Sequence, residues 1–288
     1  MNITLKQLAV FVATARLTRI SSAAEELFLT QSAASQSLKE LENNLGYQVF
    51  NRLGRRLMLN DNGRAILPKA IKMLELQTQL QQSFNNELHG HLHVVASATI
   101  GSYLLPKLLA DFVALHPKVS PTLDIGNSDE VIHRLLDGQA HIGFIEAPIT
   151  NQHLSIIPWR KDKLNVFCLP ENPLAQKKIL SIEDMSENPL ILREQGSGTR
   201  AVFVNAMQQQ GGVIANSLDL SRQEAIKEAV RAKLGLGVLS ELSIKQELTL
   251  GLFVELPTSL NLNRQFSIVQ SQFYQQNSLV KAFVAHIE

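Results

Sequence analysis

Hydrogen-bonding side chains gather on one face of a predicted helix over residues 31–45. The members of this face are Gln31, Ser32, Ser35, Gln36 and Lys39. Amide, hydroxyl and ammonium groups of this kind bond to base edges and phosphates from within the major groove of DNA. The alternative is an ordinary solvated helix face, which is richer in Glu and Lys. The pattern therefore favours a helix that reads duplex DNA.

The segment before this helix supplies the element that would hold it at the groove. A shorter helix is predicted over residues 21–28, where small residues such as Ala23 allow a second helix to cross closely. Phe28 and Leu29 are expected to fill the corner between the two helices, and Thr30 is placed to cap the second one. This order of parts predicts a helix-turn-helix.

A cationic turn follows the predicted recognition helix. Arg52, Arg55 and Arg56 surround a glycine there, and guanidinium groups so close together suit phosphates or a narrow minor groove. Residues 57–59 then return the chain to the core as the second strand of a wing. We therefore predict an N-terminal all-α winged helix-turn-helix DNA-binding domain over residues 1–60.

A long linker helix is predicted over residues 61–89, because apolar side chains recur there at spacings of three and four. The stripe consists of Ile66, Ala70, Met73, Leu80 and Phe84. Packing on its own domain is one alternative for this helix. A narrow stripe on so long a helix instead needs a partner helix to bury it. We predict a dimer, whose two recognition helices could address a two-fold DNA site.

Two hydroxyl-rich segments in the rest of the chain each lie between a predicted strand and a predicted helix. They are Ser97-Ala98-Thr99-Ile100 and Gly196-Ser197-Gly198-Thr199. Hydroxyls and free backbone N–H groups at a helix N-terminus can hold an anion, although each segment taken singly could be only a helix cap. The two segments fall in the two α/β lobes that are predicted below for residues 90–288. Together they predict a small anionic effector held between the lobes.

Two further polar residues, Asn127 and Glu146, end predicted strands and are expected to line the same cleft. A carboxylate such as Glu146 opposes a bare anion unless it pairs with a cation or is protonated. The cleft is therefore predicted to combine helix N-termini with polar side chains at strand ends.

Strands and helices alternate from residue 90 to residue 288, which predicts mostly parallel sheets with helices on both faces. We predict an α/β effector domain of two Rossmann-like lobes joined by two crossings. Lobe I covers residues 90–161 and 266–288, and lobe II covers residues 162–265. Ligands of such folds bind at the carboxyl ends of the strands, so the cleft lies where the hydroxyl-rich segments meet.

Composition excludes several other classes of protein. The chain is 45% hydrophobic and 18% charged, which is typical of a soluble globular protein. No apolar run is long enough to span a bilayer, and the N-terminus carries no signal peptide. Cys168 is the only cysteine, which excludes an intrachain disulfide and fits a reducing compartment. We predict a cytoplasmic protein without a membrane partner.

Metal and enzyme sites are not predicted. His91 and His93 would share a strand face, but no third ligand lies nearby. The segment around Ser197 lacks the Gly-x-Ser-x-Gly spacing of a hydrolase nucleophile. The pair of glycines at 235 and 237 lacks the third glycine of a dinucleotide fingerprint, and no P-loop is present. We therefore predict no catalytic residues and no cofactor.

The run LTQSAASQSLKELENNLGYQVFNRLGRRLMLNDNG resembles the DNA-binding signature of the LysR-type transcriptional regulators, without a gap. The resemblance covers essentially the whole chain. It implies that residues 90–288 form the family's effector domain, which is similar to type 2 periplasmic solute-binding proteins. The segments TIG, GN and REQGSGTR are most similar to the branch that regulates sulfur assimilation and autotrophic carbon fixation.

This resemblance implies a sequence-specific transcriptional regulator. The effector expected for this branch is sulfite, sulfate or a small anionic metabolite, and the partners implied are DNA, RNA polymerase and further copies of the chain in a homodimer or homotetramer. The sequence departs from the family at residues 16–19, where a glycine-containing turn is usual, and at His141, where Asp is common. A solute-binding protein without DNA function is the alternative, but it leaves the first 90 residues unexplained.

Overall fold

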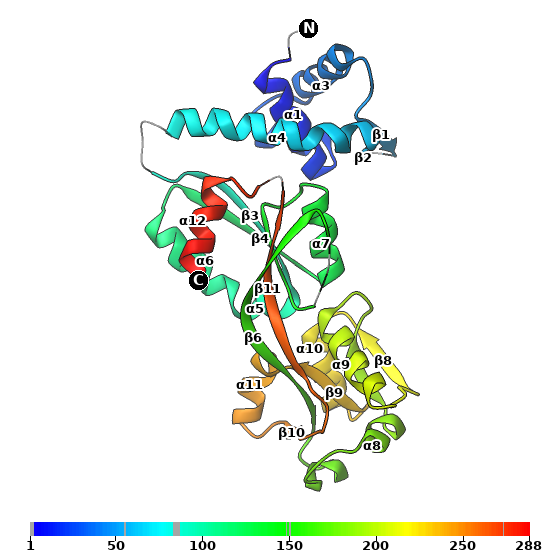
Figure 1. Cartoon of the computed structure of the whole chain (residues 1–288). Coiled ribbons are helices and arrows are strands. Elements are labelled where there is room, and N and C mark those ends of the chain that lie inside the picture. Colours follow the sequence, from blue (N-terminus) through cyan, green and yellow to red (C-terminus); the bar gives the residue numbers. More distant parts are fainter. Residues whose placement is uncertain (1–2, 55, 83–86, 148, 150, 273) are drawn as a thin grey trace.

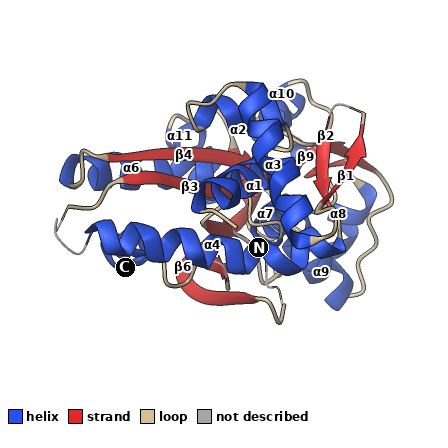
Figure 2. Cartoon of the chain, turned by 90° about the horizontal axis from the view of Figure 1, so that it is seen from above, coloured by secondary structure: helices blue, strands red, loops and turns tan. Residues whose placement is uncertain are grey.

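A computed structural model describes residues 3–54, 56–82, 87–147, 149, 151–272 and 274–288. Figure 1 shows three parts in a row: a small N-terminal part and two α/β lobes. The long helix α4 (Asp61–Gln82) lies between the small part and the first lobe. Seen from above in Figure 2, the strands β1 and β2 project at the edge away from the C-terminus.

The N-terminal part is a winged helix-turn-helix, as the sequence predicts. Its elements are α1 (Leu5–Leu17), α2 (Ile20–Glu26), α3 (Gln31–Leu45), β1 (Phe50–Leu53) and β2 (Arg56–Leu59). Thr30 caps α3 by accepting a hydrogen bond from the Ala33 N–H at 3.2 Å. Gly46 ends the helix with a φ of +81°. β1 and β2 pair antiparallel and form the wing.

Two turns of this part place residues other than glycine in left-handed backbone. Thr18 has a φ of +56°, and its carbonyl accepts a hydrogen bond from the Leu57 N–H at 2.8 Å. Phe28 has a φ of +54° and follows the end of α2. The expectation that Phe28 fills the corner between the helices is wrong, because its side chain is 97% exposed. Leu29, the other residue expected there, does pack against the core.

The linker helix α4 is shorter than predicted, since residues 87–89 are not helical. Its Leu67, Ala70 and Ile71 are buried in the chain's own core, which they share with residues of α1. Ala70 is therefore not available to a partner helix, which corrects its assignment to a dimer stripe. Ile66 is half-buried against the same core.

The exposed apolar side chains of α4 form a shorter stripe toward its C-terminal end. Met73 is 49% exposed and Leu80 is 72% exposed, and Leu76, which the sequence analysis did not include, is 51% exposed. Their spacings of three and four place all three on one helix face. Phe84 lies outside the described residues.

Lobe I follows with alternating strands and helices. Its elements are β3 (Gly90–Ser97), α5 (Ala98–Tyr103), α6 (Leu105–Leu115), β4 (Val119–Gly126), α7 (Ser128–Leu136), β5 (Ile142–Ile145) and α12 (Ser278–Ile287). Pro106 lies in the first turn of α6, where its missing N–H is tolerated, and it separates α6 from α5. β3 pairs parallel with β4 on one side and with β5 on the other.

Lobe II has the same construction around a second parallel set. Its elements are the 3₁₀ helix η1 (Pro173–Gln176), α8 (Ile182–Glu187), β7 (Leu190–Arg193), α9 (Gly198–Gln209), β8 (Ser217–Leu220), α10 (Gln223–Arg231), β9 (Leu236–Ser240), α11 (Glu241–Thr249) and β10 (Val254–Leu256). β7 pairs parallel with β8 and β9. Val166 and Phe167 belong to separate apolar clusters, so the sheet is buried on both faces.

Two long antiparallel strands, β6 (Leu154–Cys168) and β11 (Asn263–Ser271), join the lobes. Figure 1 shows both strands running from one lobe into the other. β6 pairs with β11 along residues 154–163 and continues in lobe II beside β9 and β10. Asp162, near the middle of β6, and Arg264, near the start of β11, are paired across the two strands and lie between the lobes.

The N-terminal part packs directly on lobe I. One apolar cluster includes Phe11 of α1, Ile71 of α4 and Val94 of β3, and the Arg64 guanidinium lies 3.0 Å from the Asp137 carboxylate across the contact. A cavity of about 250 Å³ remains at this junction, and His93 and His141 are among the residues that line it. Burial lowers the pKa of His93 to about 4, assisted by the nearby Arg16.

No helix in the described part of the chain is long and apolar enough to cross a bilayer. Cys168 is buried in β6, and burial raises the pKa of its thiol to about 11. The thiol therefore stays protonated at neutral pH, and its packing is that of a structural cysteine.

Candidate DNA-binding face and effector site

All five polar side chains predicted for the recognition helix are exposed on one face of α3. They are Gln31, Ser32, Ser35, Gln36 and Lys39. The opposite face holds the helix in place through Ala34, Leu38 and Leu41, which are buried. Hydrogen bonds within the chain engage only part of the face: the Ser32 hydroxyl lies 3.1 Å from the Thr30 hydroxyl, and Gln36 donates to Glu40 at 2.9 Å. The face can therefore bond to an external partner.

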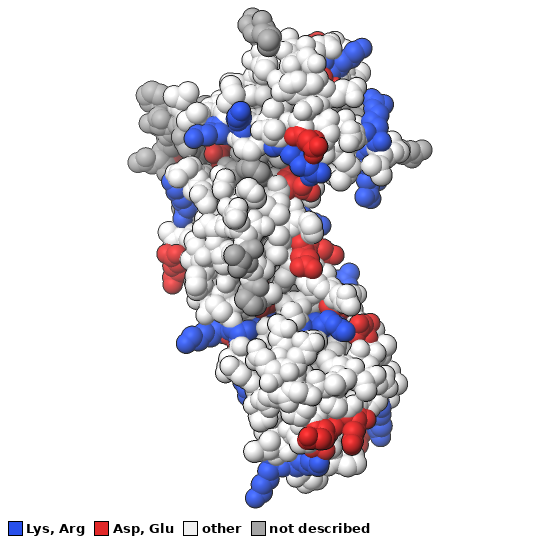
Figure 3. All heavy atoms as spheres, turned by 45° about the vertical axis from the view of Figure 1, so that its right-hand side comes forward, with Lys and Arg blue, Asp and Glu red and all other residues white. Residues whose placement is uncertain are grey.

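The wing adds positive charge beside this face. Arg52 lies on β1 and Arg56 on β2, and both side chains are exposed without a carboxylate partner among the described residues. Figure 3 shows Lys and Arg atoms along one edge of the N-terminal part. Arg55 lies outside the described residues. Guanidinium groups that no carboxylate of the chain neutralises are available to phosphates.

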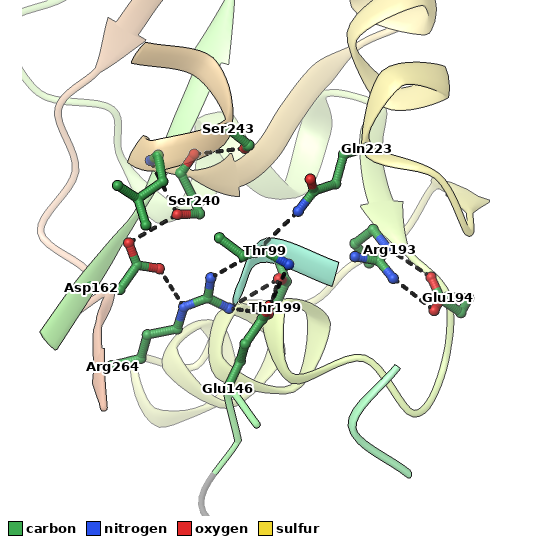
Figure 4. Close-up of polar contacts among 11 residues, drawn as sticks. Thr99, Glu146, Asp162, Arg193, Glu194, Thr199, Gln223, Ser240, Ser243 and Arg264 are labelled. Atoms are coloured by element: carbon green, nitrogen blue, oxygen red, sulfur yellow. Dashed lines mark hydrogen bonds and ion pairs between the residues drawn. The ribbon is translucent and has the colours of Figure 1, made fainter. Parts of the chain in front are cut away.

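A buried polar cluster lies between the two lobes, and Arg264 is at its centre (Figure 4). The Arg264 guanidinium donates to Glu146 at 2.7 Å and to Asp162 at 2.6 Å. It also donates to the hydroxyls of Thr99 at 3.2 Å and Thr199 at 3.0 Å. Thr99 and Glu146 belong to lobe I and Thr199 to lobe II, so a single side chain from a crossing strand connects both lobes.

The Glu146 carboxylate occupies the position that the sequence predicts for an anion. It accepts hydrogen bonds from the Thr99 backbone N–H at 2.7 Å and from the Thr199 hydroxyl at 3.1 Å. Burial alone raises the pKa of this carboxyl, but Arg264 and the Thr99 hydrogen bonds hold it below its usual range. The group is ionised at neutral pH and 1% exposed, so it does not line an open cleft as expected.

The chain itself pairs the charged groups of this cluster, with one negative charge in excess. Arg264 contributes one positive charge, and Glu146 and Asp162 contribute two negative charges, which leaves a formal charge of −1 in the cluster. Nearby Arg193 is also buried and makes two hydrogen bonds to Glu194, at 2.8 Å and 2.9 Å (Figure 4). Neither guanidinium is free to neutralise an added anion.

Three members of the cluster were not predicted as effector-site residues from the sequence. Arg264 is the one charged residue of β11, and Asp162 lies in β6 among three basic residues. Gln223, which donates to the Thr99 hydroxyl at 3.0 Å, opens a helix of lobe II. Arg264 is 118 residues from Glu146 in the sequence, so no local spacing connects them. The one feature of the sequence that pointed to Arg264 was Glu146, because a carboxylate in a cleft needs a cation.

An open cavity of about 850 Å³ lies beside the cluster, between α7 of lobe I and α9 of lobe II. Ser128 and Ser197 line it at the N-termini of these helices, together with Gly196 and Arg200. Ser128 is 2% exposed, and its hydroxyl has no hydrogen-bond partner in the described part of the chain. Ser197 makes no side-chain capping bond. A buried hydroxyl without a partner, that of Ser128, and a helix N-terminus without a side-chain cap, that of α9, therefore lie at the wall of this cavity.

Gly196 is required where the two lobes approach at this cavity. Its φ is +84°, and an added Cβ would lie 2.8 Å from an Asp129 carboxylate oxygen. The Asp129 N–H donates to the Gly196 carbonyl at 3.4 Å, which brings the start of α7 to the loop before α9. Asn127 caps α7 by accepting from the Glu130 N–H at 3.0 Å.

The structure thus separates the predicted effector residues into groups. Thr99, Glu146 and Thr199 meet in the buried cluster, whereas Gly196 and Ser197 border the open cavity. Ser97 is buried at the start of α5, and Ala98 is half-buried beside it. Ile100 is fully buried in the apolar core, so its side chain is not available to a ligand. In the described part of the chain, no group of His, Cys, Asp and Glu is arranged to hold a metal ion.

Comparison with known families matches both parts of the chain. Residues 5–64 match the family described as bacterial regulatory helix-turn-helix protein, lysR family. Residues 85–288 match the LysR substrate binding domain. The two matches together account for nearly all of the residues described above.

Relatives and solved structures agree with these matches. The chain is 37% identical over 260 residues to the transcriptional regulator YeiE of Escherichia coli K12, covering 90% of this chain and 88% of the relative. It is 32% identical over 251 residues to a RuBisCO operon transcriptional regulator of Allochromatium vinosum, covering 86% and 83%. Full-length OxyR of Pseudomonas aeruginosa superposes with a TM-score of 0.81 at 22% identity, covering 100% of this chain and 95% of OxyR.

Further relatives confirm the predicted branch, since they include CmpR of Synechocystis at 34% identity over 85% of this chain and 82% of CmpR. CysL of Bacillus subtilis is 32% identical over 84% of this chain and 82% of CysL. The helix-turn-helix, the two α/β lobes and these matches lead to one conclusion: the chain belongs to the LysR family of DNA-binding transcriptional regulators with an effector-binding domain.

Proposed function

We propose that the exposed face of α3 reads base edges in the major groove, while Arg52, Arg55 and Arg56 hold the phosphates beside it. The observation that carries this proposal is the exposure of all five polar side chains of α3 next to Arg52 and Arg56, which have no carboxylate partner among the described residues. In winged helix-turn-helix proteins the N-terminal residues of such a helix contact bases, and cationic side chains set affinity.

Substitution of Ser35 by Ala tests the reading of bases. A duplex selected from a random 30-base-pair library with the full-length chain supplies the specific site, and a scrambled duplex supplies the reference. We expect Ser35→Ala to lose about fivefold in affinity for the selected duplex, the value of one hydrogen bond, and little for the scrambled one. Lys245→Ala, an exposed change in lobe II, is the matched control. Equal losses on both duplexes would contradict groove reading.

We further propose that a small anion binds at the cavity between α7 and α9, next to the cluster of Thr99, Glu146 and Thr199. The Ser128 hydroxyl, which has no partner in the described part of the chain, and the N-terminus of α9, which has no side-chain cap, are the donors that support this site. Arg200 also lines the cavity, although it pairs with Asp219 at 2.5 Å. Sulfite, sulfate or a small phosphorylated or carboxylated metabolite has the acceptor oxygens that these donors need.

One structural neighbour supports an anionic ligand. The regulatory domain of CcmR from Synechocystis is solved in complex with 2-PG and superposes with a TM-score of 0.63 at 24% identity, covering 69% of this chain and 96% of that domain. The resident Glu146 carboxylate adds a constraint for this chain, because it already takes the Thr99 N–H and the Thr199 hydroxyl. An effector anion must bind beside Glu146 in the cavity or replace it in the cluster.

Calorimetry of the full-length chain with sulfite, sulfate, phosphate and 2-PG tests this site. We expect one of these anions to bind, and Ser128→Ala to weaken binding about fivefold without lowering the unfolding temperature, because the hydroxyl has no partner to lose. Ser217→Ala is the matched control, because Ser217 lines the same cavity but its hydroxyl already donates to Asp219. Binding that is indifferent to Ser128 would contradict the site.

The remaining expectations extend this proposal. We propose that residues 1–60 bind DNA, that residues 61–89 link and dimerise, and that 90–288 bind the effector in lobes divided at residues 161 and 265. Met73, Leu76 and Leu80 form the exposed face of α4 that would pair with a second copy. A homotetramer, contact with RNA polymerase and a location in the cytoplasm, which the family implies, stay predictions.

A further inference from the structure

The turn between α2 and α3 holds an unusual residue for its conformation. The Leu29 N–H donates to the Ala24 carbonyl at 2.8 Å, and the Phe28 N–H donates to the Glu25 carbonyl at 3.1 Å. This pair of bonds is the Schellman motif, whose left-handed position is usually glycine and sometimes asparagine. Phe28 occupies that position with a φ of +54°. A bulky side chain there strains the backbone.

The Phe28 side chain gains nothing within the chain that would offset this strain. It is 97% exposed, more than any other large apolar side chain of the described residues. Leu29, the next residue, already supplies the apolar contact that accompanies a Schellman motif. The backbone of Phe28 is therefore strained, and its ring has almost no contact with the described residues. This combination indicates a partner outside the chain.

Another Schellman motif whose left-handed residue is not glycine shows what is particular about Phe28. At the end of α10, the Leu234 N–H donates to the Ala229 carbonyl and the Lys233 N–H donates to the Val230 carbonyl. Lys233 occupies the left-handed position with a φ of +62°. Its charged side chain belongs in solvent and lies 3.5 Å from Glu171. A hydrated lysine needs no further partner, whereas an exposed phenyl ring does.

The position of Phe28 identifies the chemistry of that partner. Gln31 lies three positions further along the chain, so the Phe28 Cα lies within about 11 Å of the first residue of the recognition helix. A major groove is about 12 Å wide, and the N-terminal residues of a recognition helix contact base edges in it. An apolar ring at the rim of this groove meets the C5 methyl of thymine, which phenylalanine side chains contact.

We propose that Phe28 is a DNA-contact residue whose ring packs on a thymine methyl group at the edge of the α3 footprint. The proposal rests on the proposed reading of DNA by α3 and adds an apolar, base-selective contact to its polar ones. It predicts opposite effects of one substitution on two measurements. Phe28→Gly removes the ring and supplies the residue that the left-handed position prefers, so binding weakens while the folded chain is not destabilised.

The experiment uses the full-length chain and the duplex that it selects from a random 30-base-pair library. We expect Phe28→Gly to keep or raise the unfolding temperature and to lose at least about fourfold in affinity for the selected duplex, the value of one buried methyl group. Replacing one particular thymine of that duplex by uracil, which lacks the methyl, should cost the wild type a similar factor and cost Phe28→Gly nothing. Lys233→Gly makes the same change at the Schellman motif that ends α10 and should leave DNA affinity unchanged.

Each contrary result has its own meaning. If the wild-type chain enriches no duplex, the proposed DNA reading fails and this proposal with it. If a duplex is enriched and Phe28→Gly binds it as tightly as the wild type, only the Phe28 contact is overturned. A loss with Phe28→Gly that no uracil substitution reproduces would overturn the thymine contact, and a loss of folding cooperativity in Phe28→Gly would overturn the claim that the ring serves only a partner.

Discussion

The recognition helix and the interlobe cluster use polar side chains in opposite ways. On α3 the hydroxyl and amide groups are exposed and only partly engaged by the chain, next to arginines without carboxylate partners among the described residues. Between the lobes, Arg264, Glu146 and the two threonines are buried and bonded to one another. The first surface is left incomplete for a partner, and the second is completed by the chain itself.

This difference separates two ways of preparing a binding site. Exposed side chains on a rigid helix lose little on binding DNA, because the internal bonds on this face are few and exposed, those of Ser32 and Gln36. A ligand that enters the cluster must replace a buried ion pair, so its binding is linked to the bonds that hold the lobes together. The same replacement would alter the contact between lobes, which is what a regulator needs to pass a signal.

The largest effect is expected from removing the centre of the cluster. Arg264→Met leaves Glu146 and Asp162 buried without a cation, and breaking a buried pair in this way costs about 3–5 kcal/mol of folding stability. Thermal unfolding measures the loss. The double variant Arg264→Met/Glu146→Gln removes one of the uncompensated charges and should recover part of it. A single variant as stable as the wild type would show that the cluster does not hold the lobes.

The junction between the N-terminal part and lobe I is expected to respond to pH. Burial lowers the pKa of His93 to about 4 from an ordinary value of 6.5, so the unfolded chain binds a proton that the folded chain excludes. The stability that this group supports is complete above pH 6.5 and falls as the pH drops toward 4, by at most about 1.4 kcal/mol per pH unit. The unfolding temperature between pH 7 and pH 5 measures this slope.

His93→Gln is the control for the junction. The amide of the substituted side chain cannot take up the proton, so the variant should show a shallower fall of the unfolding temperature on acidification. His141 lines the same cavity, and burial holds the pKa of its imidazole well below its usual value. An unchanged slope in the variant would assign the pH response to His141 instead.

A smaller effect is expected from one wing arginine. Arg52→Ala should weaken binding to selected and scrambled duplexes alike and reduce the salt dependence of binding by about one unit of slope. Anisotropy titrations at several salt concentrations measure both quantities, with Lys245→Ala as the control for loss of a distant positive charge. An unchanged slope would remove the wing from the phosphate contacts.

The sequence predicted the recognition helix well because its signals are local. Thr30, Gly46 and the alternation of buried and exposed residues all lie in one short segment, and helical periodicity alone assigns each side chain to a face. The same reasoning failed at Phe28, because an apolar residue beside a core is ordinarily buried. It also failed at Ala70, because periodicity identifies a face of α4 but not the element that covers it.

The interlobe cluster could be predicted only in part. Helix N-termini after strands indicated Thr99 and Thr199, and the position of Glu146 at a strand end indicated a carboxylate near them. Arg264 could not be found in this way, because its contacts depend on the crossing of β11 between the lobes, 118 residues from Glu146. A buried charge finds its partner through tertiary packing, and a lone arginine in a strand has no spacing that reveals it.

The most direct test of the account is the effect of an anion on DNA binding by the full-length chain. A labelled selected duplex is titrated with the protein in the absence and presence of sulfite, sulfate, phosphate or 2-PG, at constant ionic strength. We predict that one of these anions changes the DNA affinity at least about fivefold, and that Ser128→Ala requires more of the same anion for the same change. An affinity that none of the anions alters, or a response that Ser128→Ala leaves unchanged, would contradict control of the DNA-binding face from the cavity between the lobes.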